Sequence, residues 1–328
     1  MLNKKTCMID TLPTVIFELL NSFFEKGVFD DYSERHFSIR ALNKDDEFFM
    51  RKYNIPCFSE TFVMNLFSKM KGLCEYFGAD KIEMFFRNQL SAGKSNYREE
   101  IFFQALSEIH ILIYFIMTGP AIVKKTTYEP CLCNGKTNPE VRFEYEDGTI
   151  IDIEVKTPEF VNKDNSRNFF LPTILLNEKS RKELANYCKD NEIECVMPRV
   201  LKIKDYINSA GTKFQLDNSE KHYNFLVVNW TYSDFFYSGL IEPVSLLCNS
   251  INGLLKKEIC NQLNIDIEAI EKISTFLLYQ MPIETLLFSD IIFWFRDRSY
   301  KVIVNPYAKN TTKEMIHMWT CYPKCENY

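Results

Sequence analysis

The sequence predicts an α/β (α+β) protein in which a mixed central sheet is flanked by helices and preceded by an N-terminal helical region. Two observations predict this class. Up to residue 118, apolar residues recur three and four positions apart, as on one face of a helix; from residue 141 they alternate with polar residues, as in a strand. Farther along the chain, helical and strand-like stretches interleave, which is the order expected when helices cover a sheet.

The expected elements follow from these periods and from turn residues. Helical blocks fill residues 12–90, and Gly119-Pro120 ends the long helix that follows. In chain order, the later elements are a helix at 97–118, a hairpin at 141–156, helices near 177–190 and 203–214, a buried strand at 223–230 and a second hairpin at 290–306. We therefore expect an N-terminal helical region, 1–92, and a second domain, 93–328, that includes a C-terminal hairpin extension.

Composition limits the function classes. The 46% hydrophobic content excludes a disordered chain. With a formal net charge of -5, the chain lacks the overall positive potential of many nucleic-acid binders, although a local basic groove can coexist with a negative total charge. The first residues meet Asp10 and Pro13 before any long apolar stretch, and the apolar run from Ile111 to Met117 is far shorter than the roughly 20 residues of a membrane span. We expect a cytoplasmic protein with no membrane partner.

Eleven cysteines, spread over the whole chain, indicate reduced thiols rather than a disulfide framework. Two close pairs, Cys131 with Cys133 and Cys321 with Cys325, do not have the usual zinc or iron–sulfur spacing, so free thiols are the simpler interpretation and a metal on them stays open. The chain contains no Gly-rich phosphate loop, nucleophile elbow or dinucleotide fingerprint. ATPase, serine hydrolase and dehydrogenase functions are therefore unsupported.

The second strand of the first expected hairpin carries charge on one face. Asp152, Glu154 and Lys156 alternate with aliphatic residues and so point to the same side. On this strand alone, a solvated face of mixed charge is the simpler interpretation. The preceding strand changes that view, because Glu140 opens it and polar residues alternate along it. A three-residue loop, 146–148, with Gly148 left-handed, sets Glu140 opposite Glu154.

Two glutamates that face each other on paired strands repel, so the pair needs a compensating cation. Oxygen ligands suit magnesium, and Lys156, two residues along the same face, would reach a metal-bound water or a substrate phosphate. Glu108 adds a third carboxylate from a largely apolar helix face, where a lone buried acid would be unfavourable. A glutamate at the helix edge that reaches solvent explains Glu108 equally well.

The order of these elements resembles the PD-(D/E)XK nuclease superfamily: a helix with Glu108, then Pro139-Glu140, then Glu154-Val155-Lys156, over roughly residues 97–230. The resemblance implies a restriction-endonuclease-like core and an Mg²⁺-dependent endonuclease, with Mn²⁺ as a substitute. It implies Glu140 and Glu154 as metal ligands, Lys156 as the catalytic lysine and Glu108 as a further catalytic acid. The first motif has Pro-Glu where the family has Pro-Asp, which lengthens that ligand by one methylene and leaves the activity of the variant open.

The resemblance extends to the helix before the buried strand, which in many such nucleases sends polar side chains toward the site. Lys213 and Gln215 are the residues expected to bind substrate there, although exposed residues at a helix end are the simpler interpretation. The implied partner is nucleic acid, above all DNA, in a restriction, antiviral defence or mobile-element setting. A homo-oligomer, or a complex with a partner from such a system, stays open.

Two other functions remain alternatives. The chain could be a catalytically inactive nuclease-fold protein that binds nucleic acid or acts as a scaffold, as its negative charge and the Pro-Glu variation suggest. It could also be a ligand-sensing α/β protein whose acids form salt bridges. Convergence of Glu108, Glu140, Glu154 and Lys156 on one point would favour the nuclease.

Overall fold

The computed structural model describes residues 72–89, 99–130, 138–158, 199–216, 221–230, 240–251, 253–280 and 300–310, with single residues between them at 69, 183, 186, 187, 190 and 191. The chain divides into two compact units. The first comprises Met1–Gly119 and Met281–Asp297, and the second comprises Pro120–Gln280 and Arg298–Tyr328. The sequence placed a domain boundary near residue 92, before the long helix, and that boundary stays a prediction.

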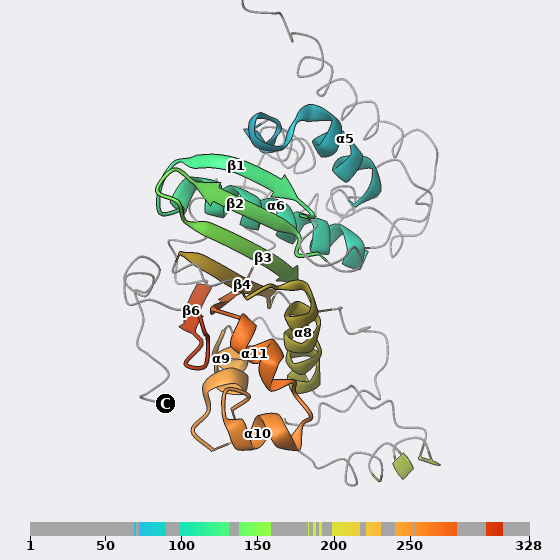
Figure 1. Ribbon diagram of the computed structural model, residues 1–328. Coiled ribbons are helices and arrows are strands. Elements are labelled where there is room, and N and C mark those ends of the chain that lie inside the picture. The colour runs from blue at the N-terminus through green and yellow to red at the C-terminus, as the bar shows by residue number, and fades with distance from the viewer. Residues whose placement is uncertain are drawn as a thin grey trace, which may run out of the picture. The chain divides into compact units, whose positions relative to one another are not determined.

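In the first unit the structure describes helices α5, Ala79–Asn88, and α6, Glu99–Thr118 (Figure 1). The sequence predicted α6 as one helix over 97–118, and this is confirmed. Ile109, Ile111 and Phe115 on α6 have no exposed surface. At its last residue, the Thr118 hydroxyl donates to the Tyr114 carbonyl at 2.7 Å, immediately before the Gly119-Pro120 stop.

The second unit is built on a six-stranded mixed sheet in the order β1-β2-β3-β4-β5-β6. The pairs β1–β2, β2–β3 and β5–β6 are antiparallel, and β3–β4 and β4–β5 are parallel, so the predicted mixed sheet is confirmed. The strands are β1, Val123–Tyr128; β2, Val141–Tyr145; β3, Ile150–Lys156; β4, His222–Asn229; β5, Thr275–Tyr279; and β6, Tyr300–Val304.

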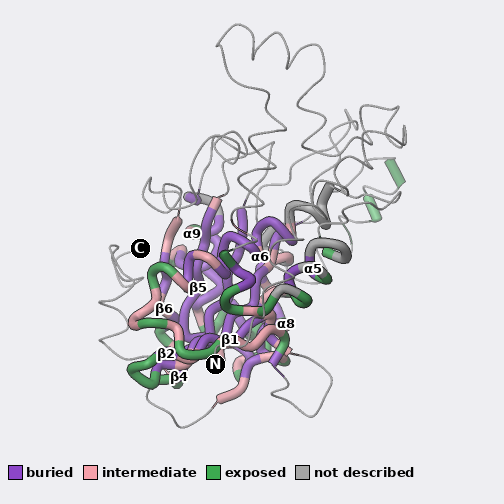
Figure 2. Tube along the Cα trace, turned by 90° about the horizontal axis from the view of Figure 1, so that it is seen from above, coloured by how far each residue is buried: buried purple, intermediate pink, exposed green. Residues whose placement is uncertain are grey.

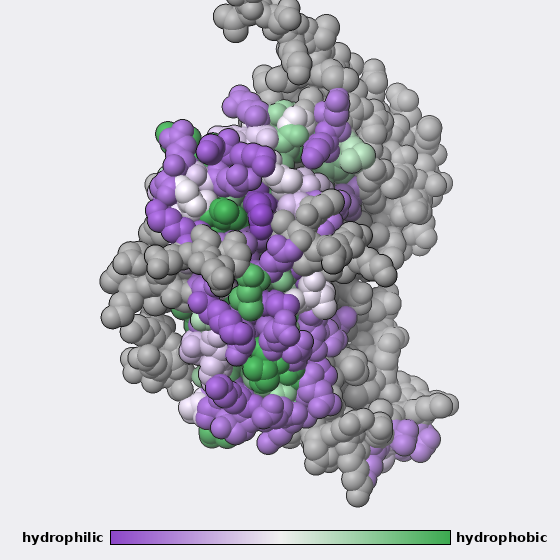
Figure 3. Space-filling view, in the orientation of Figure 1, coloured by the Kyte–Doolittle hydropathy of each residue, from purple (hydrophilic) through white to green (hydrophobic). Residues whose placement is uncertain are grey.

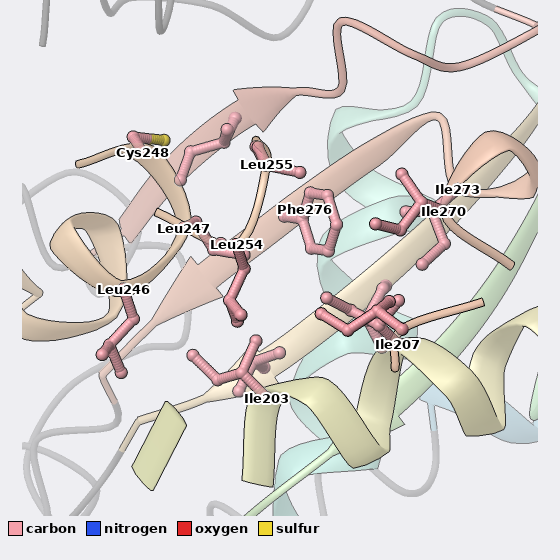
Figure 4. Packing of buried hydrophobic residues seen from close by; sticks show 14 of the residues in the cluster. Ile203, Ile207, Leu246, Leu247, Cys248, Leu254, Leu255, Ile270, Ile273 and Phe276 are labelled. Carbon is pink, nitrogen blue, oxygen red and sulfur yellow. The ribbon is translucent and has the colours of Figure 1, made fainter. Parts of the chain in front are cut away.

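The helices of the second unit lie in the crossovers between parallel strands. Helix α8, Arg199–Lys213, precedes β4, while α9, Ile241–Cys248, α10, Lys257–Gln262, and α11, Ile267–Lys272, precede β5. Both crossovers step in the same direction along the sheet, so right-handed connections place their helices on the same face. One buried cluster joins them: Ile203 and Ile207 of α8 pack with Phe276 of β5 and with leucines around α9, as Figure 4 shows.

Strands β4 and β5 are buried on both faces, because every residue of both is buried. The sequence predicted this for 223–230, where an apolar run without alternation is typical of a central parallel strand. Figure 2 shows burial concentrated along the sheet, whereas the edge strand β1 has exposed residues at Lys124 and Lys125. Lysines on an edge strand disfavour pairing with another chain.

The β2–β3 hairpin has the predicted loop and register. Val141 pairs with Ile153 and Arg142 with Asp152. The same register, extended by one residue, sets Glu140 opposite Glu154. Gly148 has φ of 84°, in the left-handed region that glycine adopts without strain. The Gly148 amide donates to the Tyr145 carbonyl at 3.1 Å, which closes the loop over residues 146–148.

Helix α8 packs closely against α11 at Gly211. A Cβ atom built on Gly211 would collide with the Cβ of Ala269 and would lie 2.5 Å from its Cα. The Lys272 ammonium also donates to the Gly211 carbonyl at 3.3 Å. Only glycine permits this approach, which fixes the carboxyl-terminal end of α8 against α11.

We expect Gly211→Ala to destabilise the protein by about 1–3 kcal/mol, the usual cost of an extra methyl group in a packed contact. Urea denaturation of wild type and variant measures this difference. Gly72→Ala is the matched control, because nothing lies within 4 Å of a Cβ there and a helical alanine is favoured. Equal midpoints for Gly211→Ala and wild type would show that the α8–α11 contact yields without cost.

Several expectations fall on residues outside those described: the helical blocks before residue 69, the first strand of the second hairpin, and Cys131, Cys133, Cys321 and Cys325. The helix near 177–190 is described only at single residues. Within the described part, no helix has both the length and the apolar character to span a membrane. In the face that Figure 3 shows, hydrophilic residues dominate the surface over α8–α11, interrupted by small hydrophobic spots.

Candidate functional site

Four charged side chains meet at the start of β2, the carboxyl end of β3 and the carboxyl end of α8. The Glu154 Oε1 atom lies 2.5 Å from the Lys156 Nζ and 2.6 Å from the Lys213 Nζ, and the Lys213 Nζ lies 3.8 Å from the Glu140 Oε1. We call these four residues the Glu–Lys cluster. It brings together Glu140, Glu154 and Lys156 of the predicted site with Lys213 from another element.

Glu140 is positioned by the backbone of the neighbouring strand. The Val155 amide donates to its Oε2 at 3.2 Å, which leaves Oε1 on the side of Lys213. This contact follows from the hairpin register, because Glu140 stands across from Glu154 and can reach the adjacent amide. The loop at Gly148 therefore determines where the Glu140 carboxylate lies.

Glu154 has no exposed surface, and its ionisation depends on its neighbours. Burial alone would raise the pKa of Glu154. The Glu140 side chain and the charges of Lys156 and Lys213 more than offset burial, so the pKa of Glu154 lies below its usual value of 4.5. The carboxylate form is thus favoured at neutral pH.

The Glu154 carboxylate is also under-coordinated when it is ionised. Two ammonium groups lie at 2.5 and 2.6 Å from Oε1, whereas Oε2 has no hydrogen-bond partner among the described residues. The lysines therefore compensate the charge through Oε1 and leave Oε2 without a partner. A buried carboxylate with unused acceptor capacity can take a further ligand.

From the sequence we expected a divalent cation to relieve the repulsion between the two glutamates. In the structure, the ammonium groups of Lys156 and Lys213 already compensate the two carboxylates, giving the Glu–Lys cluster a formal charge of zero. The side chains of Lys156 and Lys213 are 22% and 20% exposed, respectively. The cation requirement is therefore met within the protein by two lysines.

Lys213 reaches the cluster because the end of α8 is tied to the sheet. The Asn224 side chain of β4 donates to the carbonyl of Gln215 at 2.9 Å and to that of Lys272 at 2.8 Å. Gln215, the other residue expected to bind substrate, is thus held through its backbone two residues beyond Lys213. Asn224 carries no motif that the sequence could have revealed, because its role depends on the placement of both helices.

Glu108 belongs to the other unit, where it lies on α6 and is half-buried. The structure describes each unit by itself, so a role for Glu108 beside the Glu–Lys cluster stays a prediction.

A second buried network lies on the same sheet face. Asp152 is fully buried and accepts hydrogen bonds from Arg142 Nε and Nη2, each at 2.7 Å, and lies 2.9 Å from the His222 Nε2. The sequence placed Asp152 on this face but assigned His222 no role. The Arg142–Asp152 pair could have been predicted from the hairpin register. The place of His222 beside Asp152 could not, because it depends on how β3 pairs with β4.

This network predicts an acid-sensitive contribution to stability. Burial alone would raise the pKa of Asp152, but hydrogen bonds and charge from Arg142 and His222 bring it below the usual 3.8. A lowered pKa means that the unfolded chain binds the proton first as the pH falls. The contribution of Asp152 to the free energy of unfolding is therefore complete above about pH 4 and is lost as pH falls through the folded pKa.

We expect the free energy of unfolding of Asp152→Asn to change less with pH below about pH 4 than that of wild type. Urea denaturation at a series of pH values measures both; parallel curves would contradict the assignment.

The residues present fit an oxygen-preferring divalent cation. Glu140 and Glu154 offer carboxylate oxygens from adjacent strands, and the Oε2 atom of Glu154 is buried without a hydrogen-bond partner among the described residues. Mg²⁺ typically takes one or two protein carboxylates and completes its shell with water and substrate phosphate. Among the described residues, no group of three or more His, Cys, Asp and Glu side chains is arranged to hold a metal ion by itself. Such a cation would therefore depend on ligands from outside these side chains.

No family model matches the chain, and neither curated proteins nor solved structures include one similar enough to count as a relative.

Proposed function

We propose that the chain is a metal-dependent nuclease that hydrolyses phosphodiester bonds, with Glu140 and Glu154 as ligands of Mg²⁺ or Mn²⁺ and Lys156 as the catalytic lysine. One observation carries the proposal: the Glu–Lys cluster joins two carboxylates from paired strands to two lysines at the carboxyl end of a parallel strand. Ligands of α/β sheets commonly bind at such strand ends. The resemblance of Pro139-Glu140 and Glu154-Val155-Lys156 to the PD-(D/E)XK superfamily supports the same assignment.

The chain's own residues supply binding and charge. Glu140 and Glu154 would hold the cation, which when bound activates water and neutralises charge on the phosphate. The Lys156 ammonium, partly exposed beside the buried Glu154, stabilises the negative charge that develops on a phosphate held there. The pKa of Glu154, lowered by its neighbours, keeps its carboxylate ionised for this role. No covalent intermediate is required.

DNA is the substrate that the family resemblance favours, in a setting of restriction or antiviral defence. Glu108 enters the proposal as a further catalytic acid by the same resemblance.

One observation favours a second function, that of a catalytically inactive nuclease-fold protein that binds nucleic acid or acts as a scaffold. The two lysines already neutralise the two glutamates, so the cluster is also consistent with a purely structural network of ion pairs. The two functions differ in one measurable property, because a structural network neither requires a divalent cation nor hydrolyses phosphodiesters.

Cleavage of labelled double-stranded DNA, single-stranded DNA and RNA, each with Mg²⁺, Mn²⁺ or a chelator, tests the proposal. The nuclease is expected to cut DNA with either metal and not with the chelator. Binding without cutting under all conditions would favour the inactive protein. Cutting that survives chelation would reject the metal-dependent mechanism.

A further inference from the structure

Lys213 occupies a particular position in the Glu–Lys cluster. Its Nζ approaches both carboxylates, at 2.6 Å from the Glu154 Oε1 and 3.8 Å from the Glu140 Oε1. A divalent cation shared by these glutamates needs an oxygen of each within about 2.0–2.1 Å if it is Mg²⁺. The Lys213 ammonium and the divalent cation therefore require the same space between Glu140 and Glu154.

This position is built into the fold. Lys213 is the last residue of α8, whose end is fixed by the Gly211–Ala269 contact and by the hydrogen bond from Asn224 to the Gln215 carbonyl. The Lys213 backbone is thus held at a set distance from β3. The four-carbon side chain remains flexible, and it is 20% exposed, so the ammonium has a route to solvent.

The geometry points to Lys213 as a tethered counter-ion that occupies the place of the divalent cation and must leave before that cation binds. This inference rests on the proposed function, in which Glu140 and Glu154 bind a divalent cation. It adds that Lys213 sets the affinity of the site for that cation. With Lys213 between the acids, the cluster is formally neutral; with Lys213 displaced, two carboxylates and Lys156 carry a net charge of -1, which attracts a divalent cation. Metal binding and the Lys213 ion pairs are therefore mutually exclusive.

Charge removal at Lys213 separates this role from an ordinary structural one. Lys213→Met keeps most of the side-chain length and removes the competing charge, so it should bind Mn²⁺ about tenfold or more tightly than wild type. A lysine that only stabilised the fold would give equal or weaker metal binding when removed. Lys125→Met is the matched control, because Lys125 pairs with Glu144 at 2.9 Å on the same sheet but outside the cluster.

Calorimetric titration of Mn²⁺ into the full chain tests the inference in the absence of nucleic acid. Wild type, Lys213→Met, Lys213→Gln and Lys125→Met are compared, with Glu154→Gln to assign the heat to this site. We expect tighter binding in both Lys213 variants, unchanged binding in Lys125→Met and little binding in Glu154→Gln. The increase in melting temperature with Mn²⁺ should be larger for the Lys213 variants than for wild type. Lys213→Gln provides the test if Lys213→Met does not fold.

Equal or weaker Mn²⁺ binding by both Lys213 variants would overturn the inference. It would also be overturned if neither wild type nor any of the variants bound Mn²⁺. Metal-dependent cleavage by wild type together with equal affinities would reject the counter-ion and leave the nuclease intact. Tighter binding by the Lys213 variants without cleavage of any nucleic acid would keep the counter-ion and reject the nuclease.

Discussion

Glu154→Gln is expected to abolish metal-dependent cleavage, lowering the rate by about a thousandfold or more, the equivalent of about 4 kcal/mol of lost metal-assisted stabilisation. Glutamine preserves the size of the side chain but removes the charge that the lowered pKa maintains at neutral pH. The measurement is single-turnover cleavage of labelled DNA at saturating Mg²⁺.

Glu144→Gln is the control for this substitution. Glu144 lies on β2 and pairs with Lys125 at the surface, with a side chain that is 32% exposed, so its neutralisation should leave cleavage unchanged. Circular dichroism and melting temperature establish that Glu154→Gln is folded. A folded Glu154→Gln protein that cuts at the wild-type rate would exclude Glu154 as a metal ligand.

Lys156→Met should lower kcat by about a hundred- to ten-thousandfold, the range that a positioned catalytic group contributes. The Lys156 Nζ lies 2.5 Å from the Glu154 Oε1 and its side chain is 22% exposed, so it can contact a phosphate beside the buried Glu154. Because the proposed role of Lys156 is in catalysis, Mn²⁺ should still bind to the variant. Single-turnover cleavage and calorimetry separate the two quantities.

Lys125→Met again serves as the control, since it removes a lysine of the same sheet without touching the Glu–Lys cluster. Loss of cleavage with retained metal binding assigns Lys156 to catalysis. Retained cleavage would assign it to the fold alone, as a partner that only neutralises Glu154.

The sequence predicted the part of the site that local rules determine. Alternation put Glu154 and Lys156 on one face, and the glycine at 148 selected the loop that sets Glu140 across from Glu154. Both outcomes depend on residues within one hairpin, where backbone conformation and strand pairing leave few choices. The buried strand β4 was also predictable, because an apolar run of its length is typical of a central parallel strand.

The rest depended on contacts between distant segments. Strand β5 is a short apolar run, Thr275–Tyr279, whose period does not distinguish a strand from a buried helical turn. The sequence suggested Lys213 through the family resemblance, but its ion pair with Glu154 requires α8 to be fixed by Gly211 and Asn224. No local pattern encodes that arrangement. The sequence alone therefore suggested a divalent cation as the means of relieving the repulsion between the glutamates, where two lysines already do so.

The most direct test of the site is the anomalous difference map of a crystal soaked in Mn²⁺. We predict a peak between the Glu140 and Glu154 carboxylates, with the Lys213 ammonium moved away from them. A crystal with no peak at the two glutamates and with Lys213 still bridging them would contradict the metal site, leaving the Glu–Lys cluster as a structural network of ion pairs.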